Sequence, residues 1–274
     1  EYDDPGDRRF HAQPNACLRC GPSLAFWDRA GNSLAEHNDA LQMAIAALKV
    51  GKILAIKGVG GFHLCCDGTN FAAVQTLRDR KHRPDKPLAV MYPNSDLIKQ
   101  DCNLSINELK LLQSNANPIV LLRKQKLVNL AKNIAPANRE IGVMLPSTPL
   151  HYLLLKSFEK PIVATSGNLS GEPICIDNQE ALIRLSQIAD GFLVHDRPIV
   201  GAVDDSVVRI VQEKPLFLRR SRGYAPLPIL LPQATPKPLL AVGGYYKNTV
   251  AVAKNNQAYL SQHIGDLDSP PSYH

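Results

Sequence analysis

The sequence has no apolar run of about 18 residues, which excludes a transmembrane helix. It begins with the acidic stretch Glu1-Tyr2-Asp3-Asp4, so no secretory signal is visible. Only six cysteines occur, at uneven spacing, which argues against a disulfide framework. A cytoplasmic location without a membrane partner is therefore expected.

The composition is that of an ordinary folded protein. Apolar residues make up 45% and charged residues 20% of the 274 residues, enough to bury a core in one large or two modest domains. Lys and Arg number 31 against 25 Asp and Glu, a net charge of +6. This excess fits an anionic partner, such as a nucleotide, a phosphorylated metabolite or RNA, without selecting one of them.

Short apolar runs alternate with amphipathic segments between about residues 38 and 226. The runs predict strands at 53–56, 88–91, 119–122, 141–145, 161–164, 192–194, 207–211 and 216–218. Helices are predicted after Asn38 or Asp39, near 70–79 with Phe71, Val74 and Leu77 on one face, after Ser105 with Glu108 as a capping box, after Thr148 with Pro149, and after Asp177. The alternation predicts an α/β fold, a twisted mixed sheet covered by helices.

The two ends of the chain differ from this pattern. Residues 1–35 show no sustained period and are predicted to form an extended lead-in. Five prolines between Pro226 and Pro238 predict an extended linker. Strands predicted at 239–242, 249–253 and 258–261 follow it, in a tail too short to bury a core of its own.

A glycine-rich turn, Lys57-Gly58-Val59-Gly60-Gly61, follows the first buried strand. Its backbone N–H groups could cradle a phosphate, with Lys57 as a point charge. The GK[ST] and GxGxxG spacings are both missing, so a tight structural turn is an equal alternative. Lys57 and Gly60 are candidate binding residues on the first interpretation.

A basic segment runs from Arg78 to Leu88 and holds five basic and two acidic residues. One interpretation is a solvated basic helix end, where cations are favoured in any case. The other, which we favour, is an anion site in which two prolines hold Lys81, Arg83 and Lys86 in defined positions.

Two further segments carry polar side chains at strand ends. Residues 164–171 include Ser166 and Asn168, which either meet a ligand at the carboxyl edge of the sheet or are ordinary turn formers. Asp204-Asp205 either holds a metal ion on a nucleotide or caps a strand entrance. The cluster Arg219, Arg220 and Arg222 either grips phosphates or lies on a solvated strand edge.

The pair Cys17-x-x-Cys20 supplies two of the four ligands of a tetrahedral zinc. No second CxxC is present, so a zinc site needs a partner pair upstream of this chain. The histidines are expected in packing or turn roles, with His63 the least certain of them.

Taken together, these segments resemble the HypF family of carbamoyltransferases of [NiFe]-hydrogenase maturation. The motifs, in order, are KGVGGFHLCCD, RDRKHRPDKPLAVM, IGVMLPSTPLHYLL, ATSGNLSGEP, HDRPI, DDSVVR and RRSRGYAP. By this resemblance, residues 1–35 are the remnant of a zinc-finger region, 36–228 a YrdC/Sua5-like domain, 229–238 a linker and 239–274 the start of a Kae1-like domain. The missing initiator Met agrees with a processed chain or a piece of a longer one.

The resemblance implies a relay in which carbamoyl phosphate yields carbamate, ATP adenylates the carbamate, and the carbamoyl group passes to a C-terminal cysteine of HypE. The YrdC-like domain performs the middle step with ATP and Mg²⁺. Zn²⁺ is expected in the longer protein and not in this piece. The family motifs map onto Lys81 and Arg83, expected at the reacting phosphates, and onto Ser166 and Asn168. Further expected nucleotide contacts are Lys57, Gly60, Lys86, Arg219, Arg220 and Arg222.

The chain departs from related patterns in two places. The glycine turn lacks the threonines of threonylcarbamoyl-adenylate synthases, which argues against a role in tRNA modification. Residues 200–203 lack the basic residue that family members often carry there, which removes one expected anion contact. A module that binds double-stranded RNA or tRNA, and a folded but inactive fragment, are the competing hypotheses. The chain alone is not expected to complete carbamoyl transfer.

Overall fold

The computed structural model describes residues 4–7, 10, 21–126, 128–169 and 171–267. An eleven-stranded sheet is the main element. In spatial order it contains β11 (Lys214–Arg219), β10 (Val207–Val211), β6 (Ile119–Arg123), β7 (Glu140–Met144), β5 (Val90–Met91), β8 (Ile162–Ser166), β4 (Phe62–Asp67), β3 (Leu54–Lys57), β9 (Gly191–His195), β1 (Leu24–Trp27) and β2 (Ser33–Glu36). The pairs β3–β9, β5–β7 and β6–β10 are parallel and the other pairs antiparallel, so the predicted mixed α/β sheet is confirmed.

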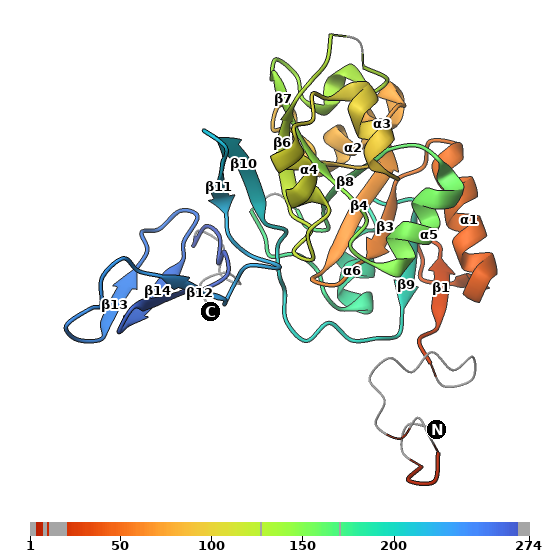
Figure 1. Cartoon of the computed structure of the whole chain (residues 1–274). Coiled ribbons are helices and arrows are strands. Elements are labelled where there is room, and N and C mark those ends of the chain that lie inside the picture. The colour runs from red at the N-terminus through yellow and green to blue at the C-terminus, as the bar shows by residue number, and fades with distance from the viewer. Residues whose placement is uncertain (1–3, 8–9, 11–20, 127, 170, 268–274) are drawn as a thin grey trace.

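Helices cover both faces of this sheet. The buried residues of α1 (His37–Lys49) and α5 (Pro149–Phe158) share one core cluster with Leu54 and Ile56 of β3. The two helices lie side by side on that face (Figure 1). Alternation along the strand turns Ala55 to the opposite cluster.

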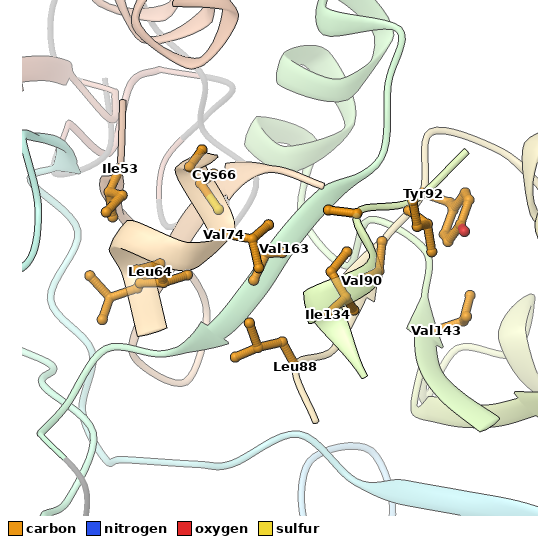
Figure 2. Packing of buried hydrophobic residues seen from close by; sticks show 14 of the residues in the cluster. Ile53, Leu64, Cys66, Val74, Leu88, Val90, Tyr92, Ile134, Val143 and Val163 are labelled. Atoms are coloured by element: carbon orange, nitrogen blue, oxygen red, sulfur yellow. The ribbon is translucent and has the colours of Figure 1, made fainter. Parts of the chain in front are cut away.

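The second cluster packs under four other helices and a short 3₁₀ helix. They are α2 (Phe71–Lys81), α3 (Ser95–Asp101), α4 (Ile106–Leu112), α6 (Asn178–Leu185) and η1 (Lys132–Ile134). Figure 2 shows Leu64 and Cys66 of β4 beside Val74 of α2. This packing holds α2 against β4 and β8, and the polar turn of residues 166–168 lies at the end of β8.

Local capping signals specify several helix starts. The reciprocal capping box of Ser105 and Glu108 is present, and the side chains of Thr148 and Asp177 accept hydrogen bonds from the first turns of α5 and α6. The cap predicted at Asn38 or Asp39 is wrong, because α1 begins after Glu36, which makes no side-chain cap bond.

Other expectations differ from the structure in ways that tertiary contacts explain. Residues 24–36 form the strands β1 and β2 rather than a lead-in. β2 is the edge strand, and β1 pairs with the buried strand β9. The strand β4, which follows the glycine turn, and the helix α3 were not predicted. Phe71 is 56% exposed, because α2 packs through Val74 and Leu77 instead.

The segment predicted as a linker contains a strand, β12 (Pro228–Leu230), which pairs with β15 (Gln257–Leu260). With β13 (Leu239–Val242) and β14 (Val250–Lys254) they form a second, four-stranded sheet, which lies beside the β10–β11 hairpin (Figure 1). A hydrogen bond from Gln262 Nε2 to the Ala202 carbonyl, 2.9 Å, joins the tail to the main domain. No helix of the described ranges is long and apolar enough to cross a bilayer.

Candidate functional site

A cavity of about 370 Å³ opens where β8, β10 and the loop after α2 meet. Its polar and charged lining comprises His63, Arg83, Lys86, Thr165, Ser166, Asn168, Glu172, Asp204, Asp205, Arg219, His263 and Asp266. Residues 263–266 of the tail also line the cavity, and no sequence pattern predicted them there. The structure thus brings five of the expected site residues to one cavity, namely Arg83, Lys86, Ser166, Asn168 and Arg219.

Lys81 is in the last turn of α2, directly behind the turn of residues 166–168 that lines the cavity. Only 1% of it is exposed. Its Nζ donates hydrogen bonds to the carbonyl oxygens of Ser166 (2.7 Å) and Asn168 (2.5 Å) and to Asn168 Oδ1 (2.9 Å). Burial, and then the charge of Arg83, lower the pKa of Lys81 to about 7. In this placement Lys81 acts on the cavity by holding the turn of residues 166–168.

The turn itself is tied at three further points. Ser166 Oγ donates to Asn168 Oδ1 (2.7 Å), and Asn168 Nδ2 donates to the Glu172 carbonyl (2.5 Å). The Gly167 N–H donates to the carbonyl of Phe62, and a Cβ on Gly167 would lie 2.7 Å from the same oxygen. Only glycine allows the turn to approach β4 this closely, so the polar side chains of the turn are held in place on the lining.

Arg83 and Lys86 are placed by the loop between α2 and β5. Arg83 Nη2 donates to the Pro87 carbonyl at 2.7 Å. Burial, and then the charges of Arg78 and Arg219, lower the pKa of Arg83 to about 10, while burial and then Arg83 lower the pKa of Lys86. Within the described ranges neither side chain forms a salt bridge, and Asp266 offsets the charge of Lys86 only in part, so positive charge accumulates here. A bound anion would relieve this repulsion.

Asp205 also lines the cavity, and its carboxylate is engaged by protein groups. Arg222 donates to its Oδ1 from Nε (2.9 Å) and Nη2 (2.7 Å), and His63 Nε2 lies 3.2 Å from its Oδ2. Burial alone would raise the pKa of Asp205, but His63 and then Arg222 hold it well below the usual carboxyl range. Sequence analysis singled out each residue but not the pairing, because His63 and Asp205 are 142 positions apart.

Four expected contacts are not brought to the lining. Arg222 is occupied by Asp205, and Arg220 donates to the Leu227 carbonyl. Lys57 is 3% exposed and donates to the His195 carbonyl at 3.0 Å, and its burial lowers its pKa. Gly60 accepts a hydrogen bond from the Val203 N–H. The structure therefore favours packing over phosphate binding for the glycine turn.

Gly60→Ala is expected to destabilise the protein by about 1–3 kcal/mol, as overpacked sites do. A Cβ at Gly60 would lie 2.2 Å from the Val203 carbonyl oxygen, so backbone must move, next to Asp204. Urea unfolding measures the change. Gly201→Ala is the matched control, because nothing lies within 4 Å of a Cβ there. Equal unfolding free energies for the two variants would contradict the packing role.

The metal expectations meet the structure only in part. Asp204 and Asp205 both line the cavity, but Asp205 is engaged by Arg222 and His63, so Asp204 is the carboxylate that suits a hard cation bound to phosphates. Among the described residues no cluster of three or more His, Cys, Asp or Glu side chains forms a metal site. Cys17 and Cys20, the expected half of a zinc site, lie outside the described residues.

Comparison with known families gives matches to three segments of the chain. Residues 46–221 match the Sua5/YciO/YrdC family, described as "Telomere recombination". Residues 1–27 match the HypF finger, and residues 234–274 match the HypF Kae1-like domain.

Individual relatives match most of the chain. A carbamoyltransferase HypF of Synechocystis sp. is 68% identical over 250 residues, which are 91% of this chain and 33% of the relative. A carbamoyltransferase HypF of Rhodobacter capsulatus is 49% identical over 270 residues, which are 98% of this chain and 36% of the relative. The chain thus spans about a third of the length of these curated relatives.

A solved structure has the same fold along nearly the whole chain. It is a full-length HypF in a phosphate- and nucleotide-bound form, 50% identical, with a TM-score of 0.88. The match covers 99% of this chain and 35% of that one.

Proposed function

The chain belongs to the Sua5/YciO/YrdC family and carries this domain between two HypF-type segments, and from this we propose that it forms carbamoyl-adenylate from ATP and carbamate. The step would serve a HypF-type carbamoyl transfer in [NiFe]-hydrogenase maturation. The observation that carries the proposal is that three cations, Arg83, Lys86 and Arg219, line the same cavity as Ser166 and Asn168.

The chemistry of adenylation fits such a lining. A carboxylate oxygen of carbamate attacks the α-phosphorus of ATP, and the bond from that phosphorus to the oxygen bridging to the β-phosphate breaks. The products are carbamoyl-adenylate and pyrophosphate, and the electron pair of the broken bond leaves with pyrophosphate. Because charge shifts onto the departing pyrophosphate, preorganised cations stabilise the transition state more than the ground state.

Different residues of the lining suit different parts of ATP. Arg83 and Lys86 carry positive charge with no salt-bridge partner in the described ranges, and this charge suits the β- and γ-phosphates. The Ser166 hydroxyl and the Asn168 amide offer short polar groups on the turn that Lys81 holds. Asp204, whose ion pair with Arg219 is long at 3.9 Å, would hold a Mg²⁺ that neutralises phosphate charge when bound.

The remaining parts of the relay follow from the HypF relatives and extend the same proposal. Carbamoyl phosphate would supply the carbamate, HypE would accept the carbamoyl group, and zinc would bind at the finger segment that contains Cys17 and Cys20. Support comes from the finger and Kae1-like matches on either side of the family domain.

Calorimetric titration of the chain with ATP and Mg²⁺ tests the binding step. We expect saturable binding, weakened about tenfold or more in Arg83→Ala, because a charge-assisted contact contributes about 1.5–3 kcal/mol. Arg123→Ala, an exposed arginine at the end of β6, is the control and should bind as the unaltered chain does. Pyrophosphate release on adding ammonium carbamate tests the chemical step. Absence of ATP binding by the folded, unaltered chain would overturn the proposal.

A further inference from the structure

The last turn of α2 contains a second buried cation, Arg78, which is only 2% exposed. Its guanidinium is surrounded by backbone carbonyl oxygens. They belong to Arg83 (2.7 Å), Pro84 (2.8 Å) and Lys86 (3.2 Å) from Nη1, to Asn133 (2.6 Å) from Nε and to Ile134 (2.9 Å) from Nη2. Three of these five carbonyls belong to the loop that carries the cavity's cations.

A buried guanidinium is ordinarily paired with a carboxylate. Within the described ranges Arg78 forms no salt bridge, and carbonyl oxygens alone receive its hydrogen bonds. The planar fork of arginine spreads its five N–H donors over two directions, here toward the 83–86 loop and toward the 133–134 backbone. Arg78 therefore joins the cation loop to a fixed part of the core beside η1.

Arg78 and Lys81 are three positions apart, so they lie on the same side of α2. Lys81 holds the 166–168 turn and Arg78 holds the 83–86 loop, and the lining contains residues from both. One helix end thus sets the spacing between the cationic and the polar parts of the cavity.

We propose that Arg78 is a positioning residue for the nucleotide site, which holds Arg83 and Lys86 together against their mutual repulsion. This inference rests on the proposed function, since the ligand it serves is the triphosphate. The charge of Arg83 disfavours that of Lys86, and Arg219 disfavours both, so a loop without the hydrogen bonds of Arg78 would relax to separate these cations. ATP binding would then have to restore the geometry, which lowers affinity.

Arg78→Lys tests the brace with little change in charge or size. A lysine places its three donors at one point and cannot reach the loop and the 133–134 backbone together. We expect the affinity for ATP with Mg²⁺, measured by calorimetry on the whole chain, to fall about tenfold or more, as for the loss of a charged hydrogen-bond network. Arg80→Lys is the matched control on the same helix, because Arg80 contacts Asp190 and the Ile188 carbonyl outside the cavity.

Two further measurements separate positioning from general stability. In Arg78→Ala, added guanidinium ion at concentrations below the unfolding transition should restore part of the ATP affinity. Pro84→Gly loosens the same loop at an exposed residue, so it should fold normally and also weaken ATP binding.

These measurements distinguish a failure of the proposed function from a failure of the role of Arg78. If the unaltered chain binds no ATP, the proposed function fails and the inference fails with it. If the unaltered chain binds ATP and both Arg78→Lys and Pro84→Gly bind it equally well, the proposed function stands and the role of Arg78 is overturned. An Arg78→Lys chain that does not fold leaves Pro84→Gly to decide.

Discussion

Lys81→Met is expected to reduce ATP-dependent pyrophosphate release by about tenfold or more, because the 166–168 turn would lose the charged hydrogen bonds that hold it on the cavity lining. Methionine keeps the apolar stem and approximate volume but removes every hydrogen bond of the ammonium group. The carbonyls of Ser166 and Asn168 and the Asn168 amide oxygen then lose their shared donor. The turn can relax away from the cavity, and the positive charge behind it disappears.

Lys49→Met, an exposed lysine at the end of α1, is the control for the loss of one positive charge. It should release pyrophosphate at the unaltered rate. Thermal unfolding of both variants shows whether each is folded at the assay temperature. A folded Lys81→Met chain with the unaltered rate would remove Lys81 from the site.

The contribution of Lys81 to ATP affinity should depend on pH, because burial lowers the pKa of its ammonium group. Because the pKa of Lys81 is lowered to about 7, the ammonium form predominates below pH 7 and is lost as the pH rises above it. ATP affinity of the unaltered chain should therefore fall between about pH 6.5 and 8.5 relative to that of Lys81→Met. The difference between the two profiles cancels the titration of ATP itself.

Local signals explain which parts of the fold were predictable from sequence. The helices after Ser105, Thr148 and Asp177 depend on side chains that bond within four residues, so their starts were predicted correctly. The strands β1 and β12 are short and pair with strands far away in sequence, so no local pattern marked them. Their existence depends on tertiary pairing.

For the site, the sequence identified several of the residues but not their contacts. The family motifs identified Arg83, Ser166 and Asn168, and the structure gathers them at one cavity. The partners of Lys81 lie 85 and 87 positions away, so no spacing rule could show that it holds a turn from behind. The Arg78 brace was missed for the same reason, because its acceptors are backbone carbonyls, which carry no sequence signal.

Asp205→Asn is expected to lower the free energy of unfolding by about 3–5 kcal/mol, the usual effect of removing one partner of a buried ion pair. The carboxylate is 11% exposed and accepts two hydrogen bonds from Arg222, whose side chain is 17% exposed. An amide carries no charge, so Arg222 would lose the group that balances its charge, and His63 would lose its carboxylate partner. Urea unfolding at neutral pH measures the loss.

Asp204→Asn is the matched control one position away. Asp204 is 30% exposed and its ion pair with Arg219 is 3.9 Å long, so its removal should change stability by less than about 1 kcal/mol. The pH dependence supplies a second check. Because the pKa of Asp205 is held below its ordinary value of 3.8, its carboxylate stabilises the fold above that pH and the contribution is lost as the pH falls through the lowered value. The stability difference between the unaltered chain and Asp205→Asn should therefore be constant near neutrality and shrink in acid, and a difference that grows in acid would contradict the ion pair.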